Sequence, residues 1–162
     1  MLDKRSPLFA QTHRFVTVFP ARLLRHDEEM GLSTLYFAGG ELRVPMVESA
    51  VGTAIEVEID ARDVSIALSR PMDVSILNRL PGEITELEVL PPPFARATLS
   101  LGDASLYALV TRESVERLAL VEGLRAWAMI KTVAINGRLL DPETAPRPRR
   151  WPSPERTSSR SR

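Results

Sequence analysis

The sequence contains two copies of one pattern, and this internal repeat limits the folds that the chain can adopt. Residues 52–59 consist of a turn glycine followed by apolar residues that alternate with acidic ones, and residues 123–130 repeat the glycine and the apolar stretch. A short β-branched run follows each copy, at residues 63–66 and 132–135. Such self-similarity predicts two related half-units that build one fold together.

Each half is predicted to contain five short strands, of which two form a hairpin. The predicted hairpins join residues 32–37 to 41–44 and residues 97–101 to 105–109, across turns that contain Gly39-Gly40 and Gly102-Asp103. Turn residues between two strand-like runs are a typical hairpin signal. A longer strand is expected before each hairpin, around residues 16–25 and 78–89, so that each half resembles a small barrel of the OB type.

We therefore predict a mainly all-β fold with two tandem OB-like barrels, at residues 15–70 and 71–140. One short helix is expected only in the second half, at residues 112–119. Thr111 can cap this helix, and two aliphatic residues of the helix fall on the same face.

The two ends of the chain differ from this body. Residues 1–14 are predicted to be a leader or linker, and residues 141–162, rich in Pro, Arg and Ser, are predicted to be a disordered basic tail. The first residues lack the apolar stretch of a signal peptide, and no segment has the roughly 18 apolar residues that span a bilayer. We expect a cytoplasmic chain without direct membrane insertion.

Composition and motifs exclude several function classes. The formal net charge is zero, so no nucleic-acid partner is expected, although a nucleic-acid-binding OB fold stays an alternative. The aromatic residues of the body are expected in the core rather than in a base-stacking groove. The chain has no cysteine and only two histidines, so no metal site is expected. Motifs for phosphate loops, metalloproteases or nucleophiles are missing, so we expect no catalytic residues and no enzyme activity.

Five residues of the second half could bind an anion. Lys131 is the only lysine of the predicted body, at the end of an apolar strand and directly before Thr132. Ser75 and Asn78 precede the strand that opens the second half, and Thr111 lies at the expected helix N-terminus, where free N–H groups favour an anion. Spacing alone leaves other interpretations open: an exposed lysine, a helix cap and a turn-forming asparagine.

Three segments of the second half resemble the molbindin (Mop/TOBE) family. Residues 75–84, SILNRLPGEI, resemble its opening Ser-Ala-Arg-Asn-Gln-Leu-x-Gly stretch. Residues 106–118 are similar to its strand-then-helix segment, and residues 127–135 to its closing Ile-Lys strand. Segments within residues 24–68 resemble the C-terminal accessory region of molybdate ABC transporter ATP-binding subunits, whereas no segment resembles the ATPase domain itself.

The resemblance implies OB-like barrels that bind molybdate, or tungstate of the same charge and similar size, without any other cofactor. Sites of this family form where modules meet, often between subunits, so the resemblance implies a homo-oligomer and possible contact with molybdate transporter subunits. The matched positions are Ser75, Lys131 and Thr132, with Thr111 on the facing segment. A lysine and hydroxyl groups would neutralise part of the charge of a tetrahedral dianion and donate to its oxygens.

Two departures from the family pattern affect the expected site. Leu77 stands where the opening motif has an arginine, and Asp60 stands where the first half would have a lysine. Because a carboxylate repels an oxoanion, we expect no site at that end of the first half. The leading hypothesis is a non-catalytic molybdate-binding module of molybdate transport or homeostasis. The alternative is a structural or regulatory dimerisation module of a transporter ATPase that binds no ligand itself.

Overall fold

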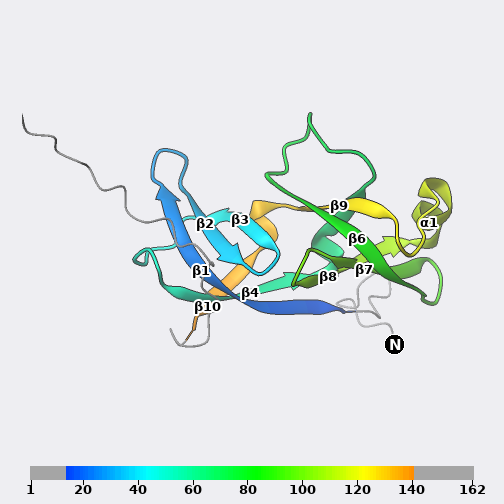
Figure 1. Cartoon of the computed structure of the whole chain (residues 1–162), viewed down its shortest axis with the longest axis horizontal. Coiled ribbons are helices and arrows are strands. Elements are labelled where there is room, and N and C mark those ends of the chain that lie inside the picture. Colours follow the sequence, from blue (N-terminus) through cyan, green and yellow to red (C-terminus); the bar gives the residue numbers. More distant parts are fainter. Residues whose placement is uncertain (1–13, 141–162) are drawn as a thin grey trace, which may run out of the picture.

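The computed structural model describes residues 14–140, which form ten strands in two sheets, one α-helix and two 3-10 turns (Figure 1). The predicted tail, and the predicted leader apart from Arg14, lie outside the described residues. Within residues 14–140, no helix has the length and apolar character needed to cross a membrane.

Sheet A is built mainly from the first half of the chain, and its strand order is β10-β4-β1-β2-β3. All neighbouring strands in it are antiparallel. Its strands are β1 (Val16–Asp27), β2 (Leu32–Phe37), β3 (Gly40–Pro45), β4 (Ala54–Asp60) and β10 (Asn136–Leu139). The predicted first hairpin is thus confirmed as β2 and β3.

Sheet B repeats this arrangement with strands mainly from the second half, in the order β5-β9-β6-β7-β8. Its strands, again all antiparallel, are β5 (Val64–Ala67), β6 (Asn78–Val89), β7 (Phe94–Ser100), β8 (Ser105–Thr111) and β9 (Arg125–Ile130). The second predicted hairpin is confirmed as β7 and β8.

Each half gives its last strand to the sheet of the other half. Strand β5 pairs with β9, so that Val64 lies opposite Ile130, and β10 pairs with β4, so that Leu139 lies opposite Ile55. The two halves of the chain are therefore linked in both directions by backbone hydrogen bonds. The residue boundaries between the two halves stay a prediction.

The apolar faces of both sheets share one core. Strands β4 and β7 show the period of two that the sequence predicted, because buried and partly exposed residues alternate along most of each strand. The buried residues of the two sheets belong to a single cluster, which includes Leu23, Leu42, Val57, Ile84, Leu99 and Ile130, all at 0% exposure. Burying one such side chain contributes about 1.5–3 kcal/mol, so the shared core is a main source of stability.

The predicted helix is present as α1 (Arg112–Leu118). The Thr111 side chain accepts a hydrogen bond from the Ser114 backbone N–H at 3.0 Å, which caps the first turn. Val115 and Leu118 pack against the core from this helix. A mainly β fold with two OB-like barrels and one short helix in the second half is therefore confirmed.

The structure corrects one prediction about the second half. Residues 132–135 are rich in β-branched side chains and were expected to form a strand like residues 63–66. Instead, Thr132–Ala134 form the 3-10 turn η2, and β10 begins only at Asn136. Val133 is 81% exposed, so its strand-like side chain packs against no sheet. A second 3-10 turn, η1 (Ala61–Asp63), precedes β5 in the same way.

Candidate functional site

Two corners of the fold occupy equivalent places, one at the end of β4 and one at the end of β9. Residue Asp60 leads from β4 into η1, and Lys131 leads from β9 into η2. Ile59 pairs with Thr17 on β1, while Ile130 pairs with Asn78 on β6. The corners therefore share their backbone arrangement and differ in their side chains.

The second corner presents a cation without a counter-ion. Lys131 is exposed, and its side chain makes no ion pair or hydrogen bond with any described residue. Thr132, the next residue, is half-buried and lies within reach of Asn78, whose Nδ2 is 3.4 Å from Thr132 Oγ1. The structure thus brings together Asn78, Lys131 and Thr132 out of the five predicted site residues.

Asn78 is held by the backbone of a strand from the other half. It is 3% exposed; its Oδ1 accepts a hydrogen bond from the Arg43 N–H at 2.7 Å, and its Nδ2 donates to the Arg43 carbonyl at 2.8 Å. This pair of bonds links β3 of sheet A to β6 of sheet B. At the equivalent place of the first half, Thr17 Oγ1 accepts a weaker bond, 3.4 Å long, from the Tyr107 N–H.

The remaining two predicted site residues make no hydrogen bond with Asn78, Lys131 or Thr132 among the described residues. Ser75 is exposed and comes three residues before β6 begins. Thr111 pairs with Phe94 across β7 and β8, at the opposite end of β6 from Asn78, and its hydroxyl contacts Ser114 in α1. Figure 1 shows α1 and the end of β9 toward opposite ends of sheet B. Membership of all five residues in an anion site stays a prediction.

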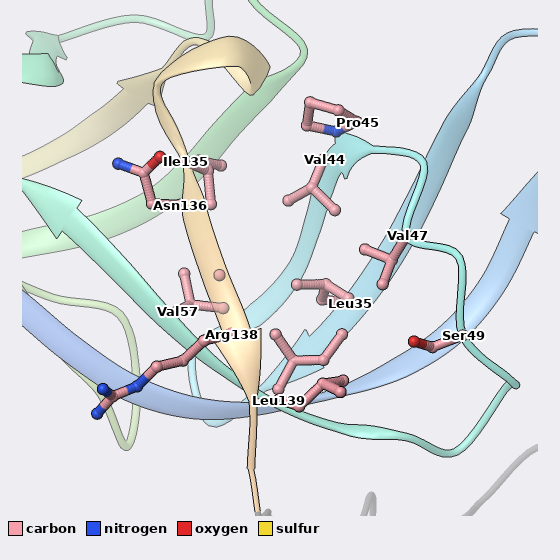
Figure 2. A pocket seen from close by; sticks show the side chains of 12 residues that line it. Leu35, Val44, Pro45, Val47, Ser49, Val57, Ile135, Asn136, Arg138 and Leu139 are labelled. Atoms are coloured by element: carbon pink, nitrogen blue, oxygen red, sulfur yellow. The ribbon is translucent and has the colours of Figure 1, made fainter.

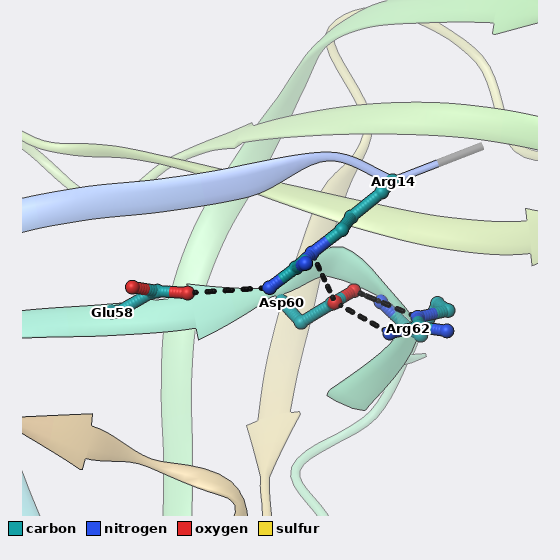
Figure 3. Close-up of polar contacts among 4 residues, drawn as sticks. All are labelled: Arg14, Glu58, Asp60 and Arg62. Atoms are coloured by element: carbon teal, nitrogen blue, oxygen red, sulfur yellow. Dashed lines mark hydrogen bonds and ion pairs between the residues drawn. The ribbon is translucent and has the colours of Figure 1, made fainter.

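The first corner carries an internally neutralised charge group (Figure 3). Asp60 binds the Arg62 guanidinium at 2.9 Å and accepts a further hydrogen bond from the Arg62 backbone N–H, also at 2.9 Å. Arg14 lies 3.7 Å from both Asp60 and Glu58. The side-chain hydrogen bond from Arg62 holds the pKa of Asp60 below its usual value, and the same bond raises the pKa of Arg62. Such a corner offers an oxoanion a carboxylate instead of an unpaired cation.

Sequence reasoning missed the residue that fixes Asn78. Arg43 lies 35 positions earlier in the chain, and the contact uses its backbone rather than its side chain. No motif or side-chain type could indicate such a partner, because any residue except proline offers the same N–H and carbonyl.

An apolar pocket of about 300 Å³ lies between β3 and β10 in sheet A (Figure 2). Leu35, Val44 and Leu139 are among its lining residues. Its one charged lining residue, Arg138, is paired with Glu56 at 2.5 Å. This lining does not suit a dianion, because burial of a charge without compensating donors is costly.

Other site types find no support within residues 14–140. No group of three or more His, Asp or Glu side chains is placed to hold a metal ion in this part of the chain. Among the aromatic residues of the body, Phe37 is buried, and four others are half-buried, namely Tyr36, Phe94, Tyr107 and Trp127. The Tyr107 ring packs against the Phe15 ring in a tilted arrangement and lies beneath the Arg96 guanidinium.

Comparison with known sequences identifies a family. The TOBE domain family matches residues 74–136. The molybdenum import ATP-binding protein ModC of Albidiferax ferrireducens is 40% identical over 120 residues, which make up 74% of this chain and 32% of the relative. ModC of Mesorhizobium japonicum is 36% identical over 119 residues, again 74% of this chain and 32% of the relative. The chain thus spans about a third of the length of these curated relatives.

Comparison with solved structures adds a relative in fold. ModG, a cytoplasmic molybdate-binding protein solved with molybdate bound, matches with a TM-score of 0.65 at 22% identity, over 75% of this chain and 94% of that chain. At this identity the likeness establishes the fold. The resemblance to the molbindin (Mop/TOBE) family that the sequence motifs predicted is therefore confirmed, and residues 74–136 carry a TOBE domain.

Proposed function

We propose that this chain is a non-catalytic module that binds molybdate, or tungstate, at the corner formed by Lys131 and Thr132. The observation that carries the proposal is the exposed Lys131 ammonium, which has no counter-ion among the described residues. The names of the relatives, which refer to molybdenum import and molybdate binding, support molybdate as the ligand. A role in molybdate transport or homeostasis, in the cytoplasm, belongs to the same proposal.

The chemistry of the corner matches a tetrahedral dianion. All four oxygens of such an ion accept hydrogen bonds, and the Lys131 ammonium offers three donors and one positive charge. The hydroxyl groups of Thr132 and Ser75 supply further donors close to the start of η2 and β6. One lysine neutralises only half of the charge of a dianion, so a complete site needs groups from elsewhere.

We infer that a second copy of the chain completes the site. Lys131 and Ser75 are both exposed, so a single copy would leave a bound anion largely in water. Thr111 lies at another end of sheet B, and in this proposal it approaches the anion from the second copy. The proposed partners are therefore a small oxoanion, a second copy of the chain and, in a transporter, its other subunits.

Calorimetric titration of the purified chain with molybdate tests the proposal, with sulfate as the competing anion and Lys131→Ala as the site variant. Arg125→Ala is a matched control, because Arg125 is an exposed cation at the start of β9, the strand that ends just before Lys131, and it has no ion pair among the described residues. We expect molybdate binding that sulfate does not equal, lost in Lys131→Ala and kept in Arg125→Ala.

Light scattering with and without molybdate tests the second copy, and the expected result is a larger particle in its presence. Absence of molybdate binding in the wild-type chain would contradict the proposal and leave the dimerisation module as the better account. Equal binding by the wild type and Lys131→Ala would place the site elsewhere.

A further inference from the structure

The orientation of the Asn78 amide is fixed by the protein itself. Its oxygen accepts from the Arg43 N–H at 2.7 Å, and its nitrogen donates to the Arg43 carbonyl at 2.8 Å. Because a backbone N–H only donates and a carbonyl only accepts, the two bonds determine which end of the amide is oxygen. Only 3% of the surface of Asn78 is exposed, so a ligand has little access to this residue.

The second N–H of the same amide is directed at Thr132. Asn78 Nδ2 lies 3.4 Å from Thr132 Oγ1, and the amide nitrogen can only donate in this contact. The hydroxyl oxygen therefore accepts, and its hydrogen is left for another acceptor. No described residue accepts a hydrogen bond from the Thr132 hydroxyl. The hydroxyl thus has its hydrogen available for a ligand, in the residue that follows Lys131 in the chain.

We propose that Asn78 is a positioning residue of the oxoanion site, which acts through Thr132 by fixing its hydroxyl as a hydrogen-bond donor. This inference rests on the proposed function of the corner. It also names the ligand class: a fully deprotonated oxoanion, whose oxygens all accept, matches Lys131 and Thr132. An anion that carries its own O–H, such as hydrogen phosphate, brings a donor that Lys131 cannot accept, and it finds only the second lone pair of the Thr132 oxygen as an acceptor in this pair of residues.

The first half shows what the corner does without this arrangement. Thr17 occupies the place of Asn78 and receives one bond from the Tyr107 N–H at 3.4 Å. A threonine there has no second N–H to give to the residue after the corner. The fold therefore tolerates threonine at this place, which makes Asn78→Thr a variant with a natural precedent in the same chain.

A double-mutant cycle with Asn78→Thr and Thr132→Val tests the proposal, with affinities for molybdate and hydrogen phosphate measured by calorimetry, or by chemical-shift titration where binding is weak. We expect Asn78→Thr alone to weaken molybdate binding by about threefold to tenfold, as for loss of one oriented hydrogen bond. In the Thr132→Val background the same change should have no further effect. The preference for molybdate over hydrogen phosphate should also fall in Asn78→Thr.

Equal weakening by Asn78→Thr in both backgrounds would overturn the proposal, because Asn78 would then act without Thr132. If the wild-type chain binds no molybdate, the proposed function fails as well, so the two failures are distinguishable. Asn136→Thr, the same substitution at an exposed asparagine on β10, serves as the control. Asn78→Ser, which keeps the hydroxyl acceptor in a smaller side chain, replaces Asn78→Thr if that variant does not fold.

Discussion

The corner at Asp60 and the corner at Lys131 share a backbone but have opposite charge. In the first, Asp60 is neutralised by Arg62 at 2.9 Å, with Arg14 close by. In the second, Lys131 has no counter-ion among the described residues. The difference teaches that a repeated backbone does not repeat its charges, since one half closes the position with an ion pair while the other leaves a cation unpaired, and the proposed anion site depends on the second corner alone.

The largest expected effect is on stability, and it tests whether the two halves unfold together. Ile59→Ala and Ile130→Ala truncate equivalent core residues that are 1% and 0% exposed. Each should lower the free energy of unfolding by about 2–5 kcal/mol, because both create a cavity in the shared core. Urea unfolding followed by circular dichroism should show one transition in each variant. Two transitions, of which each variant shifts only one, would mean that the halves unfold separately.

Charge reversal at the second corner tests whether Lys131 accounts for the expected difference in anion binding between the two corners. Lys131→Asp gives the second corner the residue of the first, and it should weaken molybdate binding by roughly 100-fold, because it removes a charge-assisted donor and adds repulsion. The measurement is calorimetric titration, with Arg125→Asp as the control for the change in net charge. A Lys131→Asp variant that binds molybdate like the wild type would show that the charge at this position does not decide anion binding.

The side-chain contacts of Asn78 and Thr17, which each join sheet A to sheet B, should differ in strength. Asn78→Ala leaves the Arg43 N–H and carbonyl without their partner and should cost about 1–3 kcal/mol of unfolding free energy. Thr17→Ala removes one bond, 3.4 Å long, and should cost about 0.5–1.5 kcal/mol. Thermal and urea unfolding of both variants measure the difference. A Thr17→Ala cost as large as that of Asn78→Ala would show that the halves are joined equally at both places.

The smallest expected effect concerns the acid side of the stability profile. The pKa of Asp60 is lower in the folded chain than its usual 3.8 because of the hydrogen bond from Arg62. Its stabilising contribution is therefore fully present above pH 3.8 and is lost as the pH falls through the lower folded value. Asp60→Asn should lower the melting temperature at neutral pH and have little effect at the acid end.

Melting temperatures between pH 7 and pH 2 check this, with the exposed Asp103→Asn as the matched control. A constant difference between Asp60→Asn and the wild type at every pH would show that charge is not the cause.

The sequence predicted the positions of the hairpins and the helix better than it predicted which strands pair across the two halves. Alternating residues and turn glycines located both hairpins, and a capping residue located α1. The exchange of β5 and β10 was not predictable in this way, since a strand shows the same period of two beside either neighbour. Residues 132–135 were misjudged because β-branched residues favour strands, whereas here the chain turns to cross between sheets.

The candidate site was only partly accessible to sequence reasoning. Lys131 stood out by composition, as the single lysine of the predicted body, which otherwise uses arginine. The proposed role of Asn78 depends on a backbone contact with Arg43 that no side-chain pattern records. The contrast with the first corner also requires the pairing of Asp60 with Arg62, which only the folded chain displays.

The exchanged strands have a consequence for synthesis of the chain. Strand β4 can pair with β10 only after β10 has been synthesised, and the hydrogen bond from the Leu140 N–H to the Ala54 carbonyl joins residues from distant parts of the sequence. Contacts of such long sequence separation form slowly. A nascent chain that ends before β10 should therefore remain open to proteases on the ribosome, and protection should appear only after residues 136–140 have emerged.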